Sequence, residues 1–214
     1  MNKDVLFTIW VSAILALPFS VQAQRTDIYN VANIKRYETA NLEIPKKQKK
    51  EKRVVFMGNS ITEGWAKVHA DWFKDNNYIG RGISGQTSPQ MLLRFQSDVI
   101  ALEPDVVVIN AGTNDIAENT GTYSPSFTLN NIKSMAEVAK AHGIKVILTS
   151  VLPHDRFGWN KKVTDVTLKV DELNQAIKAY ADENKFPYVD YNREMRDAKG
   201  AMKEGLSADG VHPY

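Results

Sequence analysis

Short runs rich in Val and Ile, separated by stretches with helical spacing, limit the folds open to this chain more than any other feature. The runs are continuous and do not alternate with polar residues, which is typical of parallel strands covered on both faces. They cover residues 54–57, 106–110, 146–149 and 188–190, with a further strand expected around Tyr78.

The stretches between these runs repeat apolar residues at a period near 3.6. Residues 127–142 and 163–184 predict long helices, ended by Gly143 and by Phe186-Pro187, and residues 89–101 predict a shorter one. Strands alternating with helices predict a doubly wound α/β sheet, which binds ligands at the carboxyl ends of its strands. With 214 residues, 43% of them hydrophobic, the chain has enough material for one such domain.

The first residues resemble a secretory signal. Lys3 precedes an apolar run over residues 5–17, and Val21-Gln22-Ala23 ends in small residues. We expect a signal peptide over residues 1–23, cleavage after Ala23, and export to the periplasm or the medium. The alternative is an uncleaved anchor, but a span needs about 20 apolar residues and this run is shorter. No stable membrane insertion is expected after cleavage.

Residues 24–52 are expected to form a solvated lead-in before a domain over residues 53–214. The lead-in ends in a basic run over residues 46–53, which has six basic residues and one acidic residue. Such a run is usually exposed chain, and the alternative is a patch that holds an acidic polysaccharide or a lipid head group. The net charge of +2 gives no reason to expect a nucleic-acid partner.

Ser60 lies where the first predicted strand turns into a helix, in the sequence GNSIT. A serine there lies near a helix N-terminus, whose N–H groups favour the negative charge that develops during attack on an ester. The alternative is a helix cap, for which Asn and Ser are common. The G-x-S-x-G elbow of α/β-hydrolases is absent, which counts against that fold.

Two further loops can supply hydrogen-bond donors. Gly85, in GISGQTS after the second strand, can bring a bare N–H into the cleft, and Asn114, in GTND after the third, can bring a carboxamide. Gly, Asn and Asp also favour ordinary turns, so neither loop is diagnostic by itself. The spacing of glycines matches neither phosphate-binding motif.

Asp209 and His212 stand three residues apart in DGVHP near the C-terminus. A carboxylate at that separation can accept the imidazole N–H, hold one tautomer and stabilise the imidazolium. The alternative is a surface loop with an incidental histidine. The four loops together provide a nucleophile, a base with its acid and three oxyanion donors, which serine ester hydrolysis requires.

These four blocks, in this order, resemble the SGNH hydrolases, also called GDSL-like lipases or acylhydrolases. Asn59 departs from the Asp that many members have before the serine. The resemblance covers the chain from about Arg53 onward and implies a flavodoxin-like three-layer α/β/α sandwich with a central parallel sheet. It also implies metal-free hydrolysis without a cofactor, through an acyl-serine on Ser60 with Asp209 and His212, and an oxyanion hole from the N–H groups of Ser60 and Gly85 and the Asn114 side chain.

The sequence stops at Tyr214, where family members continue into a final helix. We therefore expect the C-terminal helix to be missing, leaving apolar sheet surface exposed and the Asp209–His212 loop without that anchor. The four histidines, His69, His142, His154 and His212, form no ligand-spaced pair, so no metal is expected.

The predicted function is an exported serine esterase that removes a short acyl group, such as acetyl, from a carbohydrate. Its polar and aromatic loop includes His154 and Trp159, and Trp159 is placed to stack on a sugar or merely to pack. The alternatives are a lysophospholipase or short-chain lipid esterase, which needs a longer apolar groove, and a catalytically inactive glycan-binding protein on the same fold.

Overall fold

A computed structural model describes residues 27–48 and 50–214. The expected signal peptide, residues 1–23, lies outside the described residues. Five parallel strands form one sheet in the order β2-β1-β3-β4-β5, so the predicted parallel sheet is confirmed. The strands are β1 (Val54–Gly58), β2 (Tyr78–Gly82), β3 (Val106–Ile109), β4 (Lys145–Thr149) and β5 (Tyr188–Val189).

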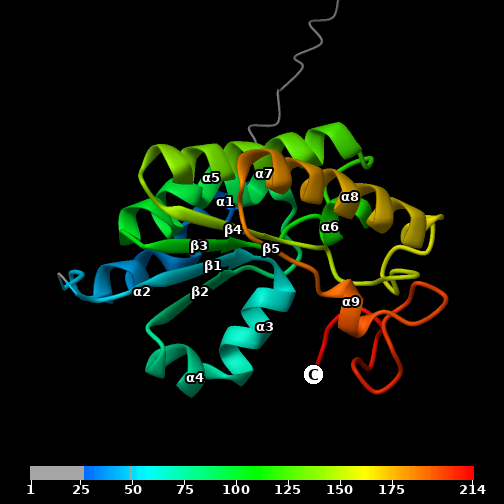
Figure 1. Ribbon diagram of the computed structural model, residues 1–214, viewed down its shortest axis with the longest axis horizontal. Coiled ribbons are helices and arrows are strands. Elements are labelled where there is room, and N and C mark those ends of the chain that lie inside the picture. Colours follow the sequence, from blue (N-terminus) through cyan, green and yellow to red (C-terminus); the bar gives the residue numbers. More distant parts are fainter. Residues whose placement is uncertain (1–26, 49) are drawn as a thin grey trace, which may run out of the picture.

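Helices cover both sides of this sheet, as expected for a three-layer α/β/α sandwich. Figure 1 shows α5, α7 and α8 on one side and α3 and α4 on the other. The three predicted helices correspond to α5 with the short 3-10 helix η2, to α7 and to α8. The helices in this part of the chain are α3 (Ser60–Val68), α4 (Ala70–Asp75), α5 (Ser88–Asp98), η2 (Ile100–Leu102), α6 (Thr113–Ile116), α7 (Pro125–Ala141), α8 (Val166–Asn184) and α9 (Asn192–Met195).

The two faces of the sheet bury different kinds of side chain. On the side of α3 and α4, Phe56 lies 5.2 Å from the ring of Trp65 and 5.3 Å from that of Phe73. On the other side, fully buried Val55 and Met57 belong to a mostly aliphatic core with residues of α5, α7 and α8. Both faces are covered, which explains why the strands carry continuous apolar runs.

The strand order places the loops after β1 and β3 side by side. The chain leaves β1 toward β2 on one side and leaves β3 toward β4 on the other, so this is the point at which the winding of the sheet reverses. Open α/β sheets bind ligands at the carboxyl ends of the strands at such a point. Ser60 follows β1 and Asn114 follows β3, which puts both at this address.

The segment before the sheet differs from the expected solvated lead-in. Residues 27–43 form α1 (Ile28–Val31), η1 (Ile34–Tyr37) and α2 (Glu38–Glu43), and Ala32 is completely buried. The Tyr37 hydroxyl donates to the carbonyl of Gly82 at the end of β2. The sequence of this segment shows no regular apolar pattern. Hydrogen bonds between side chains and backbone attach it to the domain instead.

The basic run also has partners. Lys47 and Lys52 lie 2.9 and 3.7 Å from Asp105, and the buried Arg53 donates to the carbonyls of Leu102 and Pro45. The side chain of Lys52 is 84% exposed, so only part of the run is solvated as expected.

After Met195 the chain forms turns and two isolated bridges, Arg196 with Met202 and Ser207 with Pro213. No helix occurs in residues 196–214. Within residues 27–48 and 50–214, no helix combines the length and the apolar character needed to cross a membrane.

Candidate active site

The turn between β1 and α3 is held tightly enough to fix Ser60. Asn59 is completely buried, and its side chain accepts a hydrogen bond from the N–H of Ile61 at 3.0 Å. A Cβ on Gly58 would lie 2.0 Å from Thr62 Oγ1, and one on Gly82 would lie 2.2 Å from the backbone nitrogen of Glu63. The glycines therefore let the first turn of α3 pack directly against both strands.

Ser60 meets the histidine that the sequence predicted. Its Oγ lies 2.8 Å from Nε2 of His212, although the two residues are 152 positions apart. His212 Nδ1 lies 2.7 Å from Oδ2 of Asp209. The structure thus brings the three predicted residues into one continuous series of hydrogen bonds.

The carboxylate of Asp209 also organises its own turn. Its Oδ1 accepts hydrogen bonds from the backbone N–H groups of Val211 and His212, at 2.9 and 2.8 Å, and from the hydroxyl of Ser207. Partial burial is the largest single influence on the pKa of Asp209 and raises it, but these hydrogen bonds together with that from the His212 ring outweigh it and lower the pKa well below its usual range. Asp209 is therefore held as a carboxylate that orients His212.

Gly85 and Asn114 occupy neighbouring loops that are bonded to each other. Asn114 is 3% exposed, and its Nδ2 donates to the carbonyl of Gln86 at 2.9 Å. Asn119 joins the two loops directly. Its backbone N–H donates to the carbonyl of Asn114, and its Nδ2 donates to the carbonyl of Gly85. Gly85 has φ +78°, a conformation that suits glycine. The predicted loop around Asn114 contains the single helical turn α6.

The N–H groups of Ser60 and Gly85 have no protein acceptor within the described residues. The N–H of Ser60 is the first of α3, where helices leave donors unpaired. The side chain of Asn114 has two N–H bonds, and the single bond to Gln86 leaves the other one available.

Two cavities border these residues. An apolar one of about 330 Å³ is lined by Ser60 and His212 together with Trp65, Leu152 and Tyr214 among others. Strand residues of β1 and β3 also line it. A polar cleft of about 550 Å³ is lined by Gly85, Asn119 and Trp159 and by residues of the N-terminal segment.

The loop that carries His154 and Trp159 divides between core and surface. His154 and Phe157 are buried, at 0% and 1% exposure, whereas Trp159 is 48% exposed and its ring lies 6.4 Å from that of His212. Burial lowers the pKa of His154 to about 4, so this histidine is neutral at pH 7. His154 is therefore part of the core beneath the site. Of His154, Phe157 and Trp159, only Trp159 is exposed, and it lines the polar cleft.

Three side chains at the site were not singled out by the sequence: Gln86, Asn119 and Arg94. Gln86 and Asn119 bind the loops of Gly85 and Asn114 together, and a polar residue directly after Gly85 was the available signal for Gln86. Asn119 holds Trp159 as well, because its Oδ1 accepts from the indole N–H at 2.9 Å. Arg94 lies on α5 behind the loops.

This arrangement can perform acyl transfer. A hydroxyl in contact with an imidazole can lose its proton to it, and the imidazole is oriented by a carboxylate on its other nitrogen. Unpaired N–H groups at a helix N-terminus and in a glycine turn can stabilise an oxyanion.

Known proteins agree with this geometry. The model of the GDSL-like lipase/acylhydrolase family matches residues 56–214. The structure is similar to that of a GDSL-like lipase from Bacteroides thetaiotaomicron VPI-5482, with 58% identity, a TM-score of 0.84, and coverage of 86% of this chain and 90% of that one.

Two relatives of known name are more distant. Esterase TesA of Pseudomonas aeruginosa is 26% identical over 161 residues, which are 73% of each chain. An acetylxylan esterase of Xylanibacter ruminicola is 25% identical over 211 residues, but the chain spans only 41% of the length of that protein. The chain belongs to the GDSL-like lipase/acylhydrolase family and is a carboxylic ester hydrolase.

Proposed function

We propose that Ser60 is the nucleophile of this esterase, with His212 as its general base and Asp209 as the group that orients the base. The observation that carries the proposal is the pair of contacts at His212, 2.8 Å from Nε2 to the Ser60 hydroxyl and 2.7 Å from Nδ1 to Asp209. Both lie within the range of strong hydrogen bonds, as a nucleophile and its base require.

In the proposed mechanism, Ser60 Oγ attacks the ester carbonyl while its proton moves to Nε2 of His212. Collapse of the tetrahedral intermediate breaks the bond to the alcohol, which takes that proton as it leaves. Water then gives a proton to His212 and attacks the acyl-serine, and the acid is released as Ser60 recovers its proton. Asp209 stabilises the imidazolium in both halves.

The oxyanion that forms in each step needs donors near Ser60. The N–H groups of Ser60 and Gly85 and the remaining N–H of the Asn114 side chain are the proposed set. All three follow the carboxyl ends of strands β1, β2 and β3, which are adjacent in the sheet. The side chains of Asn59, Gln86 and Asn114, which hold these loops, are buried, so the donors do not need to reorganise as charge develops.

For the substrate, we propose a short acyl group, such as acetyl, on a polar carrier such as a carbohydrate. The cleft beside Gly85 is predominantly polar, and Trp159 stands at its edge with its ring fixed by Asn119. A fixed, half-exposed indole next to polar groups suits the apolar face of a sugar ring. The relative named an acetylxylan esterase agrees with this substrate class.

A second candidate substrate is favoured by the apolar cavity. It borders both Ser60 and His212 and is walled by aromatic and aliphatic side chains, so it suits the chain of a lipid ester. The third reading, an inactive glycan-binding protein, is disfavoured by the two contacts at His212, which an inactive site has no need to retain.

We further propose that the protein is exported after cleavage of residues 1–23, so that the mature chain begins at residue 24. The pattern of Lys3, the apolar run and Ala23 supports this location. The N-terminal segment 27–43 then belongs to the enzyme itself, because it packs on the domain at Gly82 and lines the polar cleft.

The test of the mechanism is Ser60→Ala. Turnover of p-nitrophenyl acetate and labelling by a fluorophosphonate should both be lost, whereas Ser126→Ala, at an exposed serine of α7, should keep both. Retained turnover in Ser60→Ala would overturn the assignment of the nucleophile. Comparing acetylated oligosaccharides with lysophospholipids on the wild-type protein separates the two substrate classes.

A further inference from the structure

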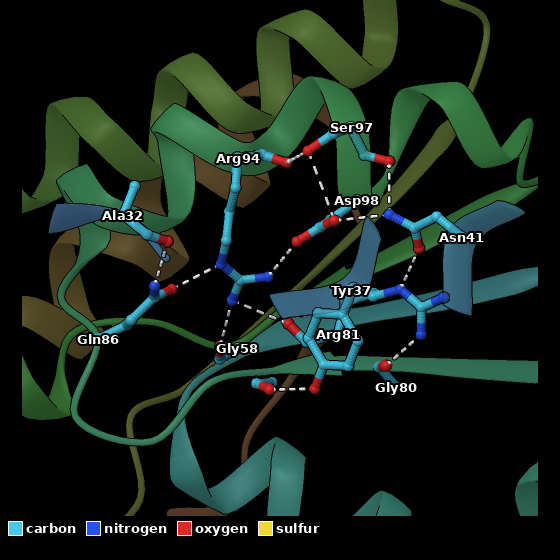
Figure 2. A network of polar contacts seen from close by, with 11 residues as sticks. Ala32, Tyr37, Asn41, Gly58, Gly80, Arg81, Gln86, Arg94, Ser97 and Asp98 are labelled. Carbon is cyan, nitrogen blue, oxygen red and sulfur yellow. Dashed lines mark hydrogen bonds and ion pairs between the residues drawn. The ribbon is translucent and has the colours of Figure 1, made fainter. Parts of the chain in front are cut away.

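Arg94 of α5 is completely buried, and its guanidinium contacts four different groups. Nη1 donates to Asp98 at 2.9 Å and Nε to Oε1 of Gln86 at 2.6 Å, while Nη2 donates to the carbonyls of Gly58 and Arg81 at 3.0 and 2.9 Å. Figure 2 shows the guanidinium at the centre of these contacts. A buried charge is costly unless it is fully paired, so each contact counts.

The two carbonyls that Arg94 holds are at the ends of neighbouring strands. Gly58 is the last residue of β1, two positions before Ser60, and Arg81 is the penultimate residue of β2, four positions before Gly85. A single side chain therefore fixes the point at which both loops leave the sheet.

Gln86 extends this control to the third donor. Its Oε1 accepts from Arg94, its Nε2 donates to the carbonyl of Ala32 at 2.6 Å, and its backbone carbonyl accepts from Asn114 at 2.9 Å. Gln86 directly follows Gly85, so its side chain sets the orientation of that peptide. Arg94 is thus connected to Gly85 and to Asn114 through a single intervening residue, Gln86.

The N-terminal segment closes the network from the outside. Asn41 donates to Asp98 at 2.8 Å and accepts from Nε of Arg81 at 2.8 Å, while the ring of Tyr37 lies 4.6 Å below the guanidinium of Arg81. Together with Ala32 these contacts cover the buried ion pair (Figure 2).

We propose that Arg94 is a positioning residue that sets the geometry of the oxyanion hole, acting through Gly58, Arg81 and Gln86. The proposal rests on the function proposed above for Gly85 and Asn114. The planar guanidinium offers five donors in a fixed fork, and an ammonium group cannot reproduce four contacts in these directions. Arg94 itself touches no reacting atom.

Arg53 provides a matched control, because it is another buried arginine that donates to backbone carbonyls. It is 3% exposed and donates to the carbonyls of Leu102 and Pro45, but it precedes β1 and so lies at the opposite end of the strands from Ser60. An arginine that only stabilises the fold should behave as Arg53 does.

The experiment uses three variants: Arg94→Lys, Gln86→Met, and a double variant that combines Arg94→Met with Asp98→Asn. The control is Arg53→Met. Each protein is assayed on p-nitrophenyl acetate at a temperature at which circular dichroism shows it to be folded. The double variant avoids an unpaired buried carboxylate, and Gln86→Met leaves the ion pair intact. We expect kcat to fall about 10- to 100-fold in the Arg94 and Gln86 variants, with KM nearly unchanged, since distortion affects the oxyanion and not the bound ester. Binding of a boronic acid, which forms a tetrahedral adduct on the serine, should weaken by a similar factor.

Arg53→Met should lower the unfolding temperature and keep kcat. If folded Arg94 and Gln86 variants also keep the wild-type kcat and boronic acid affinity, Arg94 serves only stability and the proposal is wrong. If the wild-type activity survives in Ser60→Ala, the proposed function has failed instead, so the two failures are distinguishable.

Discussion

The two halves of the active site are built in opposite ways. The turn that carries Asp209 and His212 is partly exposed, with side chains 51% and 40% accessible, and Asp209 makes its hydrogen bonds to residues no more than three positions away. In the half that carries Gly85 and Asn114, Gly85 itself is exposed but the side chains of Gln86 and Asn114 are buried. Its contacts join distant segments, for example Gln86 with Ala32, 54 positions apart.

Because of this difference, a substitution in the exposed half can change the rate without changing stability, whereas a substitution in the buried half changes both. A residue in an exposed local turn can be removed without disturbing the core, whereas a residue in a buried network leaves its partners unsatisfied. Removing the His212 ring from the first half, the triad turn of residues 207–212, should therefore affect the rate alone. Changes in the second half, the oxyanion half of Gly85, Gln86 and Asn114, should affect the rate and the free energy of unfolding together.

The largest effect is expected for His212→Ala. Without the base, kcat for p-nitrophenyl acetate should fall at least about 10,000-fold, because Ser60 has no other proton acceptor among its contacts. The free energy of unfolding, measured in urea, should change by no more than about 0.5 kcal/mol, as for other exposed side chains. His142→Ala, at an exposed histidine after α7, is the control for both measurements. A large loss of stability in His212→Ala would show that the triad turn is not independent of the core.

Asn114→Ala should have a smaller effect on the rate but a larger one on stability. Loss of one oxyanion donor should lower kcat about 100- to 1,000-fold. The carbonyl of Gln86 then loses its buried donor, so the free energy of unfolding should fall by about 1–3 kcal/mol.

The matched control for this variant is Asn174→Ala on α8. The Asn174 side chain bonds the N–H and carbonyl of Val151 at 2.7 and 3.0 Å, so its loss should cost stability while kcat stays near that of the wild type. An Asn114→Ala protein with normal stability would contradict the coupling of rate and stability in the oxyanion half.

The same contrast explains what the sequence could predict. Asp209 and His212 were recognisable because their contacts lie within one turn, which leaves a fixed spacing in the chain. The four strands that were given bounds were predicted to within one residue at each end for a similar reason: 54–57 was expected and β1 is Val54–Gly58. Contacts between residues close in the sequence can therefore be predicted from the sequence.

Arg94 could not be recognised in this way. An arginine four residues before an aspartate on a helix usually forms a surface ion pair, and the sequence does not show that Arg94 and Asp98 are both buried. The carbonyls that Arg94 binds belong to any residue type and carry no signature. Residues 27–43 were expected to be solvated for the same reason, since their attachment depends on single polar contacts such as Tyr37 with Gly82 and not on an apolar stripe.

His154 tests whether the two halves are truly separate, because it lies between them. Its Nδ1 is 3.4 Å from the carbonyl of Gly210 in the triad turn, and its Nε2 is 3.4 Å from the hydroxyl of Thr113, next to Asn114. Burial lowers its pKa to about 4, whereas an unfolded chain would have a histidine pKa near 6.5. The unfolded state therefore binds more protons between these values, and stability must fall as the pH falls.

The stability contributed by neutral His154 should be complete above about pH 6.5 and should decline progressively toward pH 4, by about 3 kcal/mol in total. Urea unfolding at several pH values measures this loss, and His154→Gln should remove most of the slope between pH 6.5 and 4, whereas His142→Gln should keep it. If the two halves are separate, the fluorophosphonate labelling rate of the folded protein should depend on pH in the same way in both variants as in the wild type. A different pH profile in His154→Gln alone would show that protonation beneath the site reaches Ser60 through Gly210 and Thr113.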